Sequence, residues 1–196
     1  AGTSGTGNAT IYSGNSTGTV WTSRTNPLTN TGWRGSNRGG IAFGNGTVCL
    51  MPTGSHANLA YSTDGTTYSA AALPSTATWL GQAYTPRWGW LAVSQSLDFA
   101  DSTDATSWSA ASVAVAPSGA SAAYSIHSLG NMYILYALQS IDKLFASVDG
   151  GATWETITAE IGASMDSVCV SGGRLYWLGS LSPSGEVAIV SDRMMV

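Results

Sequence analysis

An all-β fold is predicted from three observations: a repeated turn sequence, apolar segments of strand length between the repeats, and a composition poor in charge. The chain has 196 residues, of which 9% are charged, 43% hydrophobic and 10% aromatic. That apolar content can drive folding, while the 24 glycines and many small polar residues suit short strands and tight turns. No segment shows sustained helical periodicity. We therefore expect a single all-β domain over residues 1–196.

The turn sequence recurs at intervals of roughly 40 to 50 residues, which is the range of repeat architectures. Three plain copies, here called boxes, occupy residues 61–68 (YSTDGTTY), 101–108 (DSTDATSW) and 146–154 (ASVDGGATW). A weaker copy occupies residues 12–21 (YSGNSTGTVW), and a truncated one occupies residues 190–192 (VSD). Four short strands fit into each interval, so the repeat predicts a series of four-stranded units.

The aspartate of each box has a structural explanation. Asp64, Asp104 and Asp149 stand at the head of a tight turn, where a carboxylate accepts hydrogen bonds from the backbone N–H groups that follow. Gly65 and Gly150 come next and take the left-handed conformation at little cost. The aromatic residue that closes each box begins the next strand and packs over the hairpin. The boxes are therefore interpreted as folding devices and their aspartates as structural.

Apolar segments before each box supply the first two strands of a unit. The third strand leads into the box and the fourth follows it. Turn sequences such as Gly44-Asn45-Gly46 and Gly130-Asn131 separate the first two strands, as hairpin turns with positive φ require. The terminal units are incomplete: the N-terminal one holds strands only at residues 10–13 and 20–24. The expected first strands are residues 40–43, 79–84, 123–127 and 167–170, and the expected second strands are residues 47–51, 88–93, 132–138 and 174–178.

The Ser-x-Asp-Gly-x-Thr-x-Trp pattern of these hairpins resembles the Asp-box (BNR) repeats of sialidase-like β-propellers. The resemblance covers most of the chain and implies a small β-propeller of Asp-box blades. Five blades are favoured, with the two termini meeting where the ring closes and removes exposed sheet edges. A four-bladed ring with an N-terminal closing strand and a partial ring completed by oligomerisation are the alternatives. Asp-box propellers include glycosidases, lectin-like modules, receptors and assembly factors, so the resemblance implies architecture more than activity.

Charge and motif content argue against several function classes. The formal net charge is −4, and the six arginines and single lysine form no basic cluster, so no nucleic-acid partner is expected. No apolar run approaches the roughly 20 residues of a membrane-spanning helix, so no membrane insertion is expected. No metal-ligand spacing or cofactor motif is present, and neither a metal nor a cofactor is predicted. Cys49 and Cys169 lie in apolar runs and are expected to be buried free thiols, with a disulfide as the alternative.

Catalytic residues are not evident. A sialidase would require an arginine clamp and a Tyr–Glu nucleophile pair, which the resemblance implies, but the Arg-Ile-Pro signature is absent and none of the three glutamates has an assignable tyrosine partner. Other glycosidases need two carboxylates facing one cleft. Asp98, Asp101 and Asp104 cluster in sequence, but Asp104 belongs to a box, and strand alternation places Asp98 and Asp101 on opposite faces. The chain is therefore predicted not to be an enzyme.

Two segments between the units combine aromatic and arginine side chains with glycine or proline. Aromatic faces stack on sugar rings, and arginine donates hydrogen bonds to hydroxyls or carboxylates. An alternative is that these tryptophans fill the interfaces between blades. The candidate ligand-binding residues are Trp33, Arg34, Arg38, Tyr84, Arg87, Trp88 and Trp90.

These observations lead to one favoured function and two alternatives. The favoured function is a noncatalytic binding or structural module: a viral (phage) surface, tail or decoration protein, or a carbohydrate-binding adhesin. It would be located on a virion or extracellular surface, with a glycan or a virion protein as its partner. The alternatives are a glycoside hydrolase of the Asp-box propeller class and a protein-binding assembly scaffold, which could form a homo-oligomer.

Overall fold

The computed structural model describes residues 10–29, 31–33, 40–138, 142–157, 164–171, 174–181 and 186–192. Within these ranges the chain forms five antiparallel sheets, each built from strands consecutive in sequence, and they are called blades 1 to 5. Blade 1 is the hairpin of β1 (Ile11–Gly14) and β2 (Trp21–Arg24). Blades 2, 3 and 4 have four strands each, and blade 5 has three.

The strand order confirms the predicted repeat. In blades 2, 3 and 4 the first strand pairs with the second, the second with the third and the third with the fourth. Blade 2 contains β3 (Ile41–Gly44), β4 (Thr47–Leu50), β5 (His56–Ser62) and β6 (Ser69–Ala77). Blade 3 contains β7 (Trp79–Thr85), β8 (Gly89–Ser94), β9 (Phe99–Ser102) and β10 (Ser109–Ala110). Blade 4 contains β11 (Ala122–Leu129), β12 (Met132–Leu138), β13 (Asp142–Ser147) and β14 (Glu155–Thr156). Blade 5 contains β15 (Ser164–Ser171), β16 (Arg174–Leu181) and β17 (Glu186–Asp192).

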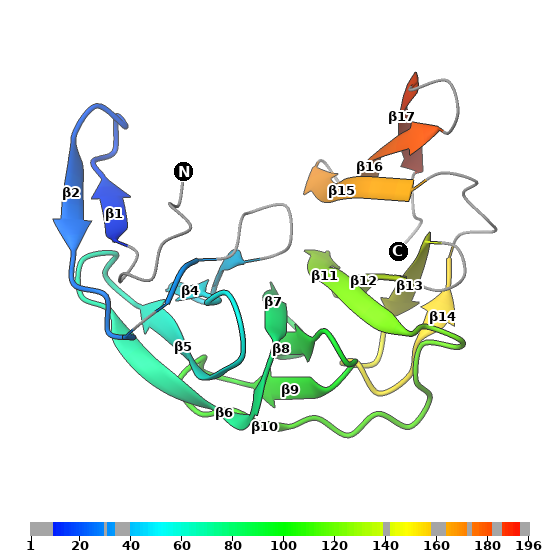
Figure 1. Cartoon of the computed structure of the whole chain (residues 1–196), viewed down its shortest axis with the longest axis horizontal. Coiled ribbons are helices and arrows are strands. Elements are labelled where there is room, and N and C mark those ends of the chain that lie inside the picture. The colour runs from blue at the N-terminus through cyan, green and yellow to red at the C-terminus, as the bar shows by residue number, and fades with distance from the viewer. Residues whose placement is uncertain are drawn as a thin grey trace.

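The blades follow one another along an arc, as Figure 1 shows. The first strands of blades 2 to 5 are neighbours in turn, with β3 beside β7, β7 beside β11 and β11 beside β15. The fold is an all-β propeller, in which each blade packs its face on the next.

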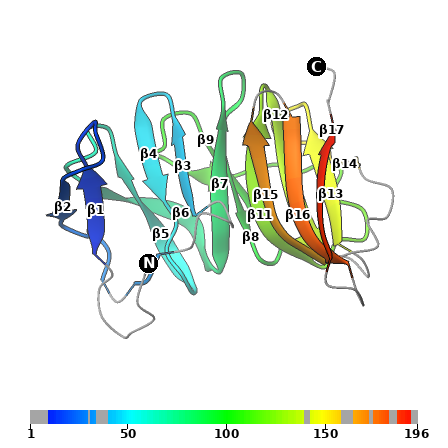
Figure 2. The same ribbon diagram turned by 90° about the horizontal axis from the view of Figure 1, so that it is seen from above.

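The arc does not close among the described residues. Blade 1 lies at one end and blade 5 at the other in two perpendicular views (Figures 1 and 2). The expected closure of a five-bladed ring is therefore not seen within the described ranges, which exclude both termini, although five blades are present in series. Blade 1 contributes two strands and blade 5 contributes three, so neither presents a complete four-stranded face to the other.

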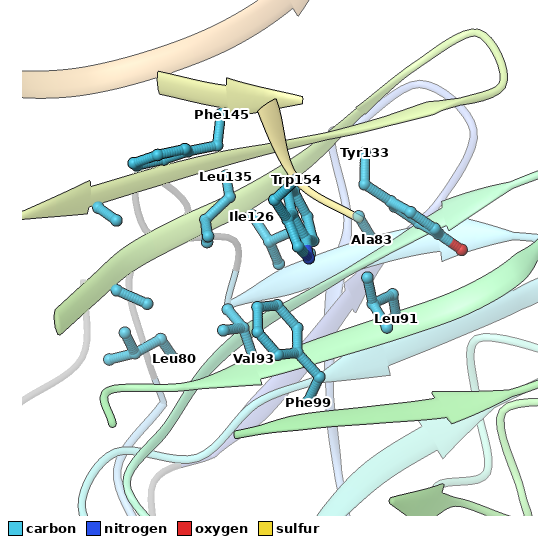
Figure 3. Packing of buried hydrophobic residues seen from close by; sticks show 12 residues of the cluster. Leu80, Ala83, Leu91, Val93, Phe99, Ile126, Tyr133, Leu135, Phe145 and Trp154 are labelled. Carbon is cyan, nitrogen blue, oxygen red and sulfur yellow. The ribbon is translucent and has the colours of Figure 1, made fainter. Parts of the chain in front are cut away.

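The core consists of apolar layers between successive blades. Between blades 3 and 4, Leu91 and Phe99 face Tyr133, Leu135 and Trp154, and all five are at most 5% exposed (Figure 3). Burial at this depth is the main favourable contribution to folding. The blades therefore depend on one another for stability, because each interior strand is covered on both faces.

Two titratable side chains lie in or beside these layers. Cys49 is fully buried between blades 2 and 3, is a free thiol, and has a pKa raised to about 12 by burial. The side chain of Cys169 lies outside the described residues. His127 of β11 is half-buried, with its Nε2 3.1 Å from Ser125 Oγ, and burial lowers its pKa to about 4. These groups fill structural positions, in agreement with the sequence interpretation.

The box aspartates hold their turns through hydrogen bonds. In blade 3, Asp104 Oδ1 accepts hydrogen bonds from the backbone N–H groups of Thr106 at 2.8 Å and Ser107 at 2.9 Å. Ser102 Oγ donates to the same oxygen and accepts from Ala105 N–H. Ala105 has φ 66°, in the conformation that the glycines of the other boxes adopt. The predicted folding role of the aspartate is thus visible in its contacts.

The first hairpin uses asparagine in the same role. Asn15 Oδ1 accepts hydrogen bonds from the N–H groups of Thr19 at 2.9 Å and Val20 at 3.2 Å. The indole Nε1 of Trp21 donates to the Gly18 carbonyl at 3.0 Å, just as Trp108 Nε1 donates to the Ala105 carbonyl at 3.0 Å. In this longer turn the amide oxygen accepts from the fourth and fifth residues after it, whereas Asp104 accepts from the second and third.

Replacing Asp104 with asparagine is expected to make the protein less sensitive to acid. Backbone hydrogen bonds from Ser107 and Thr106 lower the pKa of Asp104 to about 2 in the folded state. The usual value, about 3.9, applies to the unfolded chain, so this stabilisation is complete above pH ~4 and is lost as the pH falls towards 2. Asp104→Asn should therefore flatten the loss of thermal stability between pH 4 and 2 while changing the melting temperature little at pH 7.

The matched variant is Asp104→Ala, which removes the acceptor altogether. It should cost about 1 kcal/mol at neutral pH, as loss of a capping side chain does. Thermal unfolding of both variants and the parent chain across pH 2–7 tests the prediction. An unchanged acid slope in Asp104→Asn would contradict it.

Candidate functional site

The first turn of blade 3 departs from the repeat. In blade 2 the pairing of Gly44 with Thr47 leaves a two-residue turn, and in blade 4 the pairing of Leu129 with Met132 leaves another. In blade 3 the pairing of Thr85 with Gly89 leaves three residues: Pro86, Arg87 and Trp88. In repeat proteins, insertions map to loops and often to the binding face. This turn is therefore the first feature that distinguishes blade 3 from its neighbours.

Local contacts fix the position of Trp88. Its backbone N–H donates to Thr85 Oγ1 at 3.1 Å, and the guanidinium carbon of Arg87 lies 4.5 Å from the centre of its ring. Gly150, in the box of blade 4, comes so close that a Cβ there would lie 3.3 Å from Trp88 Cε3. The half-buried indole is thus held between its own turn and the next blade.

Gly89 brings the turn against the end of β9. Its φ is +86°, and a Cβ at this position would lie only 2.8 Å from the Ser102 carbonyl oxygen, so glycine is required there. Tyr133 of blade 4 donates its hydroxyl to the Gly89 carbonyl at 2.7 Å. The first turn of blade 3 and its box are therefore side by side at the same end of the sheet.

The two turns enclose a pocket of about 160 Å³, here called the Trp88 pocket. Its wall contains one indole, one carboxylate and four hydroxyl side chains. Asp101 is exposed, and its Oδ1 accepts a hydrogen bond from Ser109 Oγ at 2.9 Å. The residues that line the pocket are Trp88, Asp101, Ser102, Thr103, Ser107 and Ser109.

Asp101 is the second feature particular to blade 3, at a position that holds a different residue in each of blades 2, 3 and 4. It pairs with Ser109, whereas the corresponding pairs are Tyr61 with Ser69 in blade 2 and Ala146 with Glu155 in blade 4. Blade 3 thus carries its unusual turn and its unusual carboxylate at the same pocket.

The aspartates near the pocket have different hydrogen-bond partners. Asp104 is occupied by the backbone of its own turn. Asp98 precedes β9, and its Oδ2 accepts a hydrogen bond from Ser94 Oγ at 2.9 Å, whereas Asp101 lies near the end of β9. The three aspartates that cluster in sequence are thus divided between separate turns. Asp101 is the one carboxylate that lines the pocket.

The structure distributes the predicted ligand-binding residues among different environments. Arg87 and Trp88 lie at the pocket, with Arg87 exposed over the indole. Trp90, at 1% exposure, lies in the layer between blades 2 and 3 and has no surface for a ligand, so its prediction as a ligand contact is corrected. Tyr84 packs on it with ring centres 5.3 Å apart. Trp33 is half-buried and bridges to Pro52, and Arg34 and Arg38 lie outside the described residues.

Sequence reasoning missed the box side of the pocket. The box pattern assigns residues 101–108 to a hairpin turn, and it does not point to Asp101, Ser107 or Ser109 as ligand contacts. A usable signal was present, because in a four-stranded meander the turn between strands 1 and 2 and the turn between strands 3 and 4 lie at the same end. The box of blade 3 therefore had to lie beside the segment that carries Trp88.

Two searches of the described residues for other kinds of site found none. Among them, no group of three or more His, Cys, Asp or Glu side chains is placed to hold a metal ion. No helix in this part of the chain is long and apolar enough to cross a membrane.

Comparison with known proteins shows similarity in fold. No protein-family model matches the chain, and no curated protein matches it. Among solved structures, YCF48 from Cyanidioschyzon merolae superposes with a TM-score of 0.59 at 12% identity, over 89% of this chain and 62% of that one. The GH74 xyloglucanase from Xanthomonas campestris gives 0.59 at 16% identity, over 80% of this chain and 29% of that one. A structure of YCF48 bound to D1 peptide gives 0.54 at 19% identity, over 86% and 59%.

These neighbours are β-propeller proteins, and the chain shares their fold. It spans less than two thirds of the length of each of the three.

Proposed function

We propose that this chain is a noncatalytic binding module that holds its ligand at the Trp88 pocket. The observation that carries the proposal is that blade 3 differs from its repeats at two places, and both meet at one pocket. A repeat position free of functional demands would be expected to follow its neighbours, as the corresponding turns of blades 2 and 4 do.

The composition of the pocket supports binding over catalysis. Hydrolysis of a glycosidic bond by the usual mechanism requires two carboxyl groups about 5–10 Å apart. One carboxylate, that of Asp101, lines the Trp88 pocket. The nearby carboxylate of Asp104 accepts hydrogen bonds from the N–H groups of its own turn. An indole beside several hydroxyl groups is instead suited to recognition of a polar ligand with an apolar face.

Within this class, we favour a carbohydrate-binding protein of a virion or cell surface. The low charge and the Gly, Ser and Thr content motivate the surface location. Recognition of a protein segment is a second candidate function. It is favoured by the similarity in fold to YCF48, one structure of which contains a bound D1 peptide.

Replacing Trp88 with alanine is expected to weaken ligand binding strongly. The parent chain would first be screened against an array of neutral and acidic glycans and against a peptide library. Because the indole forms one wall of the pocket, Trp88→Ala should weaken the affinity for any ligand found by at least about tenfold, as loss of a central aromatic contact does. Binding is measured by surface plasmon resonance, and folding by circular dichroism.

The matched control is Trp21→Ala. Trp21 is also an aromatic residue at a hairpin turn, but it lies in blade 1 and is 64% exposed. This variant should bind like the parent chain. Binding that survives in Trp88→Ala, or the lack of any ligand among glycans and peptides, would refute the proposed function.

A further inference from the structure

We infer that the ligand of the Trp88 pocket is a single neutral pyranose residue, free or at the end of a glycan. This inference rests on the proposed function and makes it specific. It follows from the size of the pocket, the hydrogen-bonding groups in its wall and the sign of its charge.

The size of the pocket restricts the ligand to a small unit. Pockets for drug-sized molecules have volumes of roughly 300–1,000 Å³. The Trp88 pocket, at about 160 Å³, is about half the lower limit. One sugar ring or one amino-acid side chain matches this scale, and an extended segment of either polymer exceeds it.

The hydroxyl groups in the wall suit a ligand that is itself rich in hydroxyls. Thr103, Ser107 and Ser109 are exposed. The hydroxyls of Thr103 and Ser107 can both donate and accept a hydrogen bond, and Ser109 Oγ, which donates to Asp101, can still accept one. A sugar ring presents hydroxyls with the same double capacity. A peptide strand would instead need a free sheet edge to pair with, and the adjacent outer strand β10 is only two residues long.

The charge of the pocket disfavours anionic ligands. Asp101 lines the wall, whereas Arg87 does not belong to the lining and has its guanidinium over the Trp88 ring. An anion in the pocket would meet the Asp101 carboxylate without a compensating cation in the lining. A neutral sugar can donate a hydroxyl hydrogen to that carboxylate in a charge-assisted hydrogen bond. Its C–H groups can contact the part of the indole that lines the pocket beside the Arg87 guanidinium.

The test uses the full chain and isothermal titration with three groups of probes. These are methyl glycosides of glucose, galactose and mannose; sialic acid and glucuronic acid; and short Ser-rich and Lys-containing peptides. At least one neutral glycoside is expected to bind at least about tenfold more tightly than either acidic sugar or any peptide.

Variants then locate the interaction. Asp101→Asn is expected to weaken binding of the neutral glycoside about tenfold, through loss of the charged acceptor. Ser109→Ala is expected to weaken it several-fold, because Ser109 Oγ orients that carboxylate. The control is Ser69→Ala, since Ser69 pairs with Tyr61 in blade 2 as Ser109 pairs with Asp101 in blade 3. Ser69→Ala should leave the affinity unchanged.

The outcomes separate the two proposals. Preferential binding of an acidic sugar or a peptide, lost in Trp88→Ala, would overturn the inference of a neutral pyranose and leave the binding function standing. Binding of the neutral glycoside that is equal in Asp101→Asn, Ser109→Ala and Ser69→Ala would also overturn the inference. No binding of any probe, or binding unaffected by Trp88→Ala, would overturn both.

Discussion

Replacing Trp154 with alanine is expected to lower the free energy of unfolding by about 3–5 kcal/mol, the usual cost of removing a large buried aromatic side chain. Trp154 closes the box of blade 4 and is 3% exposed. Its ring stacks on Phe99 of blade 3, with ring centres 5.4 Å apart and planes inclined by 27° (Figure 3). The substitution therefore opens a cavity in the layer that joins the two blades. Urea unfolding, followed by fluorescence and circular dichroism, measures the loss.

Trp21→Ala is the internal comparison for this prediction. Trp21 occupies the same position of its box, but it is 64% exposed and lies over its own hairpin beside Gly14. Its removal should cost about 1 kcal/mol or less, as for an exposed side chain. Trp154→Phe should fall between the two, because it keeps an apolar ring in the layer. Equal losses for Trp154→Ala and Trp21→Ala would contradict the placement of Trp154 in a buried layer between blades 3 and 4.

Gly44→Ala is expected to destabilise the protein by about 3 kcal/mol or more, at the upper end of the cost of overpacking. A Cβ on Gly44 would overlap Cγ, Cδ1 and Cβ of Tyr84. Tyr84 Cβ is fixed to the backbone, so a change of rotamer cannot remove the clash. Strands β3 and β7 would have to separate, which would disturb the layer between blades 2 and 3. Differential scanning calorimetry and urea unfolding measure the effect.

Gly46→Ala provides the control in the same turn. Gly46 has φ +73° and open space around its Cβ position, so the variant incurs only the strain of the left-handed conformation, about 1–2 kcal/mol. Gly44→Ala should be clearly the less stable of the two. A smaller loss in Gly44→Ala than in Gly46→Ala would show that β3 and β7 do not approach as closely as described.

Much of the local structure could be predicted because the box residues determine the turns and the spacing of the strands. The spacing of Asp64, Asp104 and Asp149 set the blade period, and the segments before each box became the predicted strands. These features depend on interactions within a few residues, such as a carboxylate and the N–H groups that follow it. Local sequence is sufficient to specify such contacts.

The closure of the ring could not be predicted in the same way. Closure depends on the small angle between each pair of packed blades, which the side chains of two separate sheets determine together. The repeat period gave the number of units, and it contained no information on the curvature of the arc.

The aromatic residues of blade 3 show a second limit. Trp88 and Trp90 are two residues apart, yet one lies at the pocket and the other in the core. In a propeller the interior blades are covered on both faces, so alternation along β8 places Trp90 and Leu91 in two different buried layers. Trp88 is only half-buried because it belongs to the turn before that strand. The polar and aromatic content of the segment alone does not show which tryptophan lies at the pocket and which lies in the core.

The central claim is that the chain binds a ligand at the Trp88 pocket, and the most direct measurement is a nuclear magnetic resonance titration of the labelled chain with the methyl glycosides. The chain has eight tryptophans, and the spectrum of Trp88→Phe identifies the indole signal of Trp88. The signals of the Trp88 indole and of the Thr103 and Ser109 amides are predicted to move together with one saturation curve, while the Trp21 indole stays unchanged. Movement confined to signals away from blade 3, or none in any titration, would contradict the claim.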